Sequence, residues 1–110
     1  RKAIVFYKKE PAAELYQLDD GTFVFRYLDT WFYDERKPAI SLTLPIKQQE
    51  YRSESLFPFF FNMLPEGSNK QSVCFQNRID DEDAFGLLLA TATSDTIGAV
   101  TIQKIENSNE

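Results

Sequence analysis

The chain has 110 residues, with 12 basic and 17 acidic side chains, one cysteine and no histidine. This length fits a single domain. The lack of histidine excludes Ser–His and Cys–His catalytic pairs and the HExxH zinc motif. A single cysteine forms neither an internal disulfide nor a CxxC site. We therefore predict a protein that is not an enzyme and that has no cofactor and no metal site.

The net charge of −5 argues against direct binding of nucleic acid, because Lys and Arg side chains that neutralise phosphates supply most of that affinity. No apolar stretch approaches the roughly 20 residues that cross a bilayer, so we expect no membrane partner and a cytoplasmic location. Ten phenylalanines are an unusual excess for this length. The fold must bury them or offer some of them to a partner.

The first half of the chain has the pattern of an antiparallel meander. Phe23, Phe25 and Tyr27 alternate with polar or β-branched residues, so they share one buried face of a strand. Asp19-Asp20-Gly21 predicts the tight turn before this strand. The predicted strands are 3–7, 13–17, 22–27 and 40–44, the last with Ile40, Leu42 and Leu44 pointing inward, and 29–37 is predicted to be a loop or a short helix.

The second half predicts helices followed by a last strand. Apolar residues at helical spacing predict a helix over 56–64 with Ser53 or Ser55 as its cap. Asp80 is predicted to cap a second helix, which the apolar spacing after it supports. The remaining elements are a weaker helical turn or two over 68–75, a strand over 98–105 and a polar tail over 106–110. We predict an α+β domain over 1–105, mainly an antiparallel sheet of about five strands with two to three helices packed on one side.

The helix predicted over 56–64 is apolar nearly all round. One stripe of side chains is enough to cover the sheet, yet Phe57, Phe61 and Leu64 form a second stripe that also needs a cover. Either the segment 68–75 folds over this second stripe, or part of it is a surface that docks a partner. Trp31 raises the same choice, because it is either a local core plug under its loop or an interface anchor.

Two other clusters have simpler interpretations. The acidic run over 80–83 lacks the ligand spacing and central glycine of a calcium loop, and carboxylates are favourable at a helix N-terminus. Cys74 is near Lys70 and Arg78, so a reactive thiolate is conceivable, but a small buried apolar residue is the simpler interpretation. We expect neither cluster to perform chemistry.

Five segments occur in a distinctive order along the chain. They are FVFRY at 23–27, ISLTLP at 40–45, FFFNMLPEG at 59–67, DDEDAFGLL at 80–88 and DTIGAV at 95–100. In order and spacing they resemble the N-terminal subdomain of HipA-type serine/threonine kinases. The chain departs from that family in the first hairpin, where a glycine pair is absent and Tyr7-Lys8-Lys9-Glu10 stands in its place. It also departs where Ala92-Thr93-Ser94 replaces glycines before Asp95.

The resemblance implies a partner kinase, since the phosphate loop, catalytic Asp and magnesium ligands of such a kinase are absent from this sequence. A chain with only this subdomain is similar to the HipS proteins of three-part HipBST toxin–antitoxin systems, and the polar segment 103–110 is expected to be a natural terminus. We predict an antitoxin that binds and restrains a HipA/HipT-type kinase, with a HipB-like DNA-binding protein as a further partner. The alternative is a structural subdomain that completes such a kinase and supports its contact with a DNA-binding antitoxin. Candidate partner-binding residues are Trp31, Phe57, Phe61 and Leu64, with Pro65, Glu66 and Gly67 fixing the adjacent turn.

Overall fold

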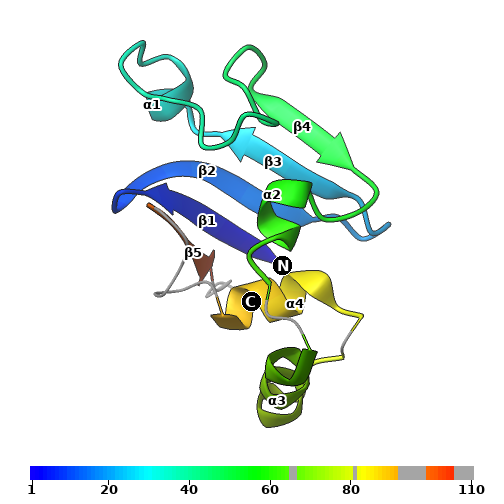
Figure 1. Ribbon diagram of the computed structural model, residues 1–110. Coiled ribbons are helices and arrows are strands. Elements are labelled where there is room, and N and C mark those ends of the chain that lie inside the picture. The colour runs from blue at the N-terminus through cyan, green and yellow to red at the C-terminus, as the bar shows by residue number, and fades with distance from the viewer. Residues whose placement is uncertain (65–66, 81, 92–98, 106–110) are drawn as a thin grey trace.

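A five-stranded antiparallel sheet forms the body of the molecule (Figure 1). The structure is a computed structural model that describes residues 1–64, 67–80, 82–91 and 99–105. The strands lie in the order β4-β3-β2-β1-β5, so the last strand pairs with the first. They are β1 (Lys2–Tyr7), β2 (Glu10–Gln17), β3 (Phe23–Tyr27), β4 (Glu50–Ser53) and β5 (Val100–Ile105). The predicted α+β class, with about five strands, is confirmed.

Helices cover one face of this sheet. Two single-turn helices, α1 (Asp29–Phe32) and α2 (Pro58–Phe61), precede the longer α3 (Gly67–Asn77) and α4 (Ala84–Thr91). The Phe25 ring lies 5.8 Å from that of Phe60 in α2, and the Phe23 ring lies 5.9 Å from that of Phe85 in α4. In Figure 1, α2 lies across the sheet while α3 packs beside α4, away from the strands. Among the described residues, no helix has the length and apolar character that a membrane crossing requires.

The strand predicted over 40–44 is wrong, because this segment is a loop. Ser41 uses its side chain locally, since its Oγ accepts the Thr43 backbone N–H at 3.2 Å and its carbonyl accepts the Leu44 N–H at 3.1 Å. Such short-range bonds compete with a strand ladder. Leu42 is therefore not inward but 99% exposed. The fourth strand is instead β4, in which Tyr51 pairs with Phe25.

The helix predicted over 56–64 is shorter than expected and has a different start. Phe57, not a serine, is the residue before the first turn, and no side chain caps α2. Pro58 accounts for this, because proline suits the first helical position and drives the preceding residue into extended backbone. Beyond Phe61 the chain makes turns closed by bonds such as that from the Leu64 N–H to the Phe61 carbonyl, 3.1 Å. The segment predicted as a helical turn or two over 68–75 is in fact the longest helix described, α3.

The hairpin between β1 and β2 turns on Lys8 and Lys9, which replace the glycines of the resembled pattern. Their φ angles are 50° and 69°, so both residues occupy the left-handed region that glycine and asparagine prefer in such turns. The Lys8 N–H donates to the Ala99 carbonyl at 2.9 Å and ties this turn to the approach of β5. The hairpin thus turns without glycine, at a cost in backbone strain.

Replacing this pair by Lys8→Asn with Lys9→Gly is expected to raise the free energy of unfolding by about 1–2 kcal/mol, because the strain is relieved. Urea unfolding followed by fluorescence measures the gain. The control is Lys47→Gly, an exposed position with φ outside the positive range, where added chain entropy should give no gain. An equal change in the free energy of unfolding for the two variants would contradict the presence of strain at Lys8 and Lys9.

Candidate partner-binding surface

The aromatic residues around α2 divide into buried and exposed members. Phe60 is fully buried, and Phe57 is only 6% exposed with its ring 6.3 Å from that of Phe25. Phe61 is 58% exposed. The prediction that Phe57 offers a contact surface is therefore wrong for this fold, because Phe57 precedes the proline-started turn and points into the core. Phe61 is the member of the second stripe that remains available to a partner.

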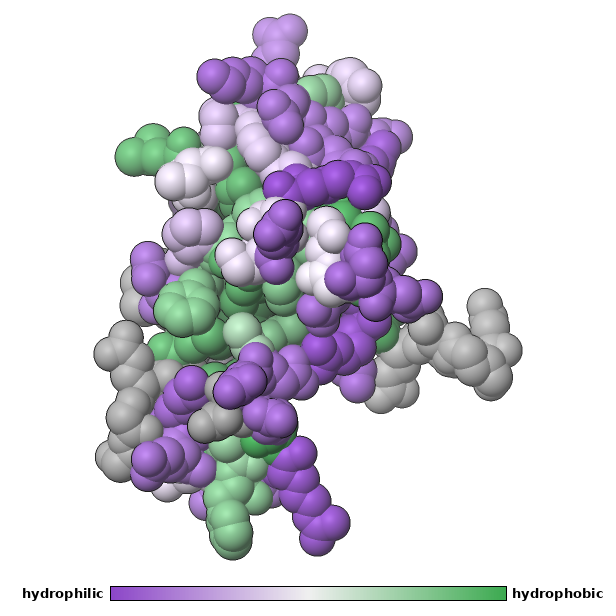
Figure 2. Space-filling view, turned by 90° about the vertical axis from the view of Figure 1, so that its right-hand side faces the viewer, coloured by the Kyte–Doolittle hydropathy of each residue, from purple (hydrophilic) through white to green (hydrophobic). Residues whose placement is uncertain are grey.

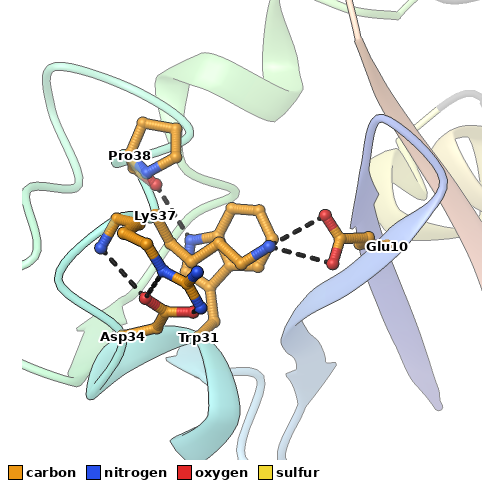
Figure 3. Close-up of polar contacts among 6 residues, drawn as sticks. Glu10, Trp31, Asp34, Lys37 and Pro38 are labelled. Carbon is orange, nitrogen blue, oxygen red and sulfur yellow. Dashed lines mark hydrogen bonds and ion pairs between the residues drawn. The ribbon is translucent and has the colours of Figure 1, made fainter.

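Trp31 is a buried core residue and not an exposed residue that could contact a partner. Its side chain is 2% exposed, and its Nε1–H donates to the Pro38 carbonyl at 2.9 Å. Lys37 lies over the indole, with its Nζ 5.0 Å from the ring centroid. The same Nζ donates to both Glu10 carboxylate oxygens at 2.9 Å, and Figure 3 draws these contacts as dashed lines. The indole also meets Tyr7 edge-on at 5.8 Å. Trp31 therefore fastens the loop after α1 to the first hairpin, which corrects its assignment as a partner contact.

The remaining predicted site residues follow α2. Leu64 is partly buried and packs against the main core, so little of it faces outward. Gly67 begins α3. Pro65 and Glu66 lie outside the described residues. The structure therefore places Phe61 and Leu64 one turn apart, and Phe61 alone of the two is largely exposed.

Sequence reasoning missed three exposed apolar residues, namely Tyr33, Leu42 and Phe75. Phe75 is 86% exposed on α3, and apolar atoms are visible in Figure 2 at the lower end of the molecule, where α3 lies. In the sequence, Phe75 directly follows Val73 and Cys74 in a segment that is otherwise polar, and this pattern does not show which of the three is exposed. The alternation over 40–44 predicts a strand with Leu42 pointing inward, so this pattern gives no sign that Leu42 is exposed.

A groove of about 420 Å³ opens beside Phe61. Apolar side chains from three parts of the chain line it, namely Phe23 of β3, Leu56 before α2 and Phe85 of α4. All three are themselves buried, so they form a closed floor, whereas Phe61 stands at the edge. Figure 2 shows apolar atoms gathered in the middle of one face of the molecule, with hydrophilic residues above and below them. This groove and Phe61 together form the candidate surface, which we call the Phe61 groove.

The acidic run has a structural role at Asp83. This carboxylate, and not Asp80 as predicted, caps α4, because its Oδ1 accepts the Gly86 N–H at 3.0 Å. Arg1 donates to both of its oxygens, at 2.7 and 2.8 Å. A Cβ at Gly86 would collide with the Asp83 carboxylate, so a larger residue there would displace this carboxylate from its capping position. Asp80 instead accepts the Glu82 N–H within a local turn.

The Arg1 guanidinium holds the pKa of Asp83 below its usual range, and the Gly86 N–H adds to this effect. Because the folded pKa is depressed, the stabilisation is present above the unfolded value near 4 and is lost as the pH falls through the folded pKa. Asp83→Asn is expected to keep the cap and to flatten this acid dependence. Asp83→Ala should cost about 1–2 kcal/mol, because the cap is lost as well. Urea unfolding between pH 2 and 7 tests both, and equal losses at pH 7 would contradict the cap.

Cys74 is buried at 8% exposure, which fits its interpretation as a small apolar residue of α3. Within the part of the chain that the structure describes, no three His, Cys, Asp or Glu side chains gather as metal ligands would.

Residues 3–103 match the family model of the HipA N-terminal domain, and the chain belongs to this family. The chain is also similar to a solved structure, the N-terminal domain of HipA toxin, with a TM-score of 0.72 and 31% identity. That match covers 97% of this chain and 94% of the other. The recognition made from the five sequence segments is confirmed.

Two curated relatives place the domain in different contexts. A protein of Haemophilus influenzae is 40% identical over 65 residues, which are 59% of this chain and 60% of that protein, so the two chains have nearly the same length. A Sinorhizobium fredii protein named "Putative kinase Y4dM" is 31% identical over 106 residues. The match covers 91% of this chain but only 26% of that protein. The matched segments thus cover 60% of the first relative and 26% of the second.

Proposed function

We propose that this chain is a non-catalytic interaction module, similar to HipS, that binds a HipA-type serine/threonine kinase and restrains it as an antitoxin. The observation that carries the proposal is the exposed Phe61, beside an apolar groove, on a domain of the HipA N-terminal family. In the relative named as a kinase, a segment similar to this chain makes up about a quarter of the protein. A surface that fits the rest of such a kinase is therefore expected on this domain.

Restraint would act through differential binding. A partner shifts a kinase between active and inactive states only as far as it binds one state better than the other. Phe61 can supply such binding energy, because a large aromatic side chain that becomes buried at an interface is a frequent hot spot. The place of action is expected to be the cytoplasm, with the kinase as the direct partner and a HipB-like DNA-binding protein as a further member of the complex.

The test is co-expression with a HipA-type serine/threonine kinase. The wild-type chain should co-purify with the kinase, lower its autophosphorylation and relieve its toxicity. Phe61→Ser is expected to weaken binding about tenfold or more, as for a hot spot. Leu42→Ser is the control, because it also removes an exposed apolar side chain, but away from the groove. Failure of the wild-type chain to bind or to change autophosphorylation would overturn the proposal.

A second candidate function is a structural subdomain that completes a HipA-type kinase and supports its contact with a DNA-binding antitoxin. The Sinorhizobium relative favours it, since the matching segment there belongs to a longer chain. The same co-expression separates the two functions. Restraint predicts rescue from the kinase, whereas completion predicts greater toxicity and more autophosphorylation when this chain is present.

A further inference from the structure

We infer that the Phe61 groove docks a segment of the partner kinase in which an apolar side chain is flanked by Lys or Arg residues. This inference rests on the proposed function and adds the chemistry of the segment that is bound. Its grounds are the shape of the groove and the sign of every charged residue that lines it.

The groove has the size and floor of a site for one or two side chains. Its volume of about 420 Å³ lies within the range of small-molecule and side-chain pockets. The floor consists of side chains that already belong to the core, namely Phe23, Leu56 and Phe85. A partner's apolar side chain would therefore meet packed, preformed walls, with Phe61 closing over it from the edge. Little reorganisation would be needed, which favours binding.

The charged residues that line the groove are all acidic, namely Glu54, Glu82 and Asp83. Asp83 is neutralised by Arg1 at 2.7 Å, whereas Glu54 and Glu82 form no ion pair with any described residue. A neighbouring hollow, lined by Asp20 and Glu54, extends the negative rim. A rim of one sign attracts a segment of the opposite sign and raises its association rate.

The same charges disfavour a second copy of this chain as the occupant. Two copies joined by a two-fold axis would place identical patches against each other. The carboxylates of Glu54 and Glu82 would then face their own equivalents in a chain whose net charge is −5. Like charges brought together at an interface are destabilising, so a basic and apolar segment fits this groove better.

The experiment measures binding to the kinase and, separately, to two synthetic peptides. The first peptide is Lys-Lys-Leu-Trp-Leu-Lys-Lys, and the second has Glu in place of each Lys. The variants are Glu54→Lys in the groove and Glu35→Lys, a matched charge reversal at an exposed residue that does not line it. Backbone NMR shifts of the labelled chain report where each peptide binds, and light scattering reports the oligomeric state.

We expect Glu54→Lys to weaken kinase binding about tenfold and to reduce its salt dependence, with no change for Glu35→Lys. The basic peptide should shift the Phe23 and Phe85 signals, and the acidic one should not. If the kinase binds but Glu54→Lys matches Glu35→Lys, the groove inference is overturned and the proposed function stands. If the kinase does not bind, the proposed function fails, and the peptide shifts alone decide the groove chemistry. A dimer that Phe61→Ser abolishes would also overturn the inference.

Discussion

Phe60→Ala is expected to lower the free energy of unfolding by about 3–5 kcal/mol, whereas Phe61→Ala should change it by less than about 1 kcal/mol. The two residues are neighbours in α2, but Phe60 is fully buried and Phe61 is largely exposed. The Phe60 ring lies 5.2 Å from that of Phe59 and 5.8 Å from that of Phe25. Truncation of Phe60 therefore opens a cavity where the helix meets the sheet.

The expected loss at Phe60 is large beside the roughly 5–15 kcal/mol that stabilise a domain of this size. Urea unfolding of both variants measures it, and each kcal/mol corresponds to a few degrees in Tm. Phe61→Ala is the matched control, because it removes the same atoms from the same turn. Equal losses for the two variants would show that Phe61 is a core residue and would remove the basis of the proposed binding surface.

Tyr27→Phe is expected to cost about 1–3 kcal/mol, because it leaves two buried backbone groups without partners. The Tyr27 hydroxyl donates to the Leu44 carbonyl at 2.6 Å and accepts the Ile40 N–H at 3.1 Å. It thus pins both ends of the loop that the sequence predicted as a strand. Tyr33→Phe is the control, since it removes a hydroxyl from an exposed tyrosine. A negligible loss at Tyr27 would contradict the pinning role.

The same hydroxyl predicts how stability changes in alkali. Burial raises the pKa of Tyr27 to about 12, above the ordinary value of 10.0. Because the folded pKa is raised, the stabilisation is complete below pH 10 and is lost as the pH rises toward 12. Urea unfolding between pH 8 and 12 should show this decline in the wild type and a smaller decline in Tyr27→Phe. Parallel curves would exclude a contribution from this hydroxyl.

Local pattern was sufficient where one signal dominated. Alternation identified β3, the Asp19–Gly21 turn was recognised from its residue types, and the turn forms with Gly21 at a φ of 95°. Pattern was insufficient where a loop has the same alternation of residues as a strand. Ile40, Leu42 and Leu44 have the spacing of a strand, but the Tyr27 hydroxyl of β3 binds the backbone of Ile40 and Leu44 instead. Within the same loop, the Ser41 side chain accepts the Thr43 N–H. No local signal in 40–44 could show that Tyr27 would approach it.

The sequence by itself determined the family, the α+β class and the surplus of apolar residues around 57–64, because these depend on residue types, order and spacing. Only the tertiary structure decided which of those residues remain exposed. Phe57 and Trp31 have the same aromatic character as Phe61, but the proline-started turn and the Glu10–Lys37 pair fix them inside the core. Exposure depends on what packs against a side chain, and residues distant in sequence supply those contacts. Phe61 lies at the edge of the groove because β3, α2 and α4 meet beside it and none of them covers it.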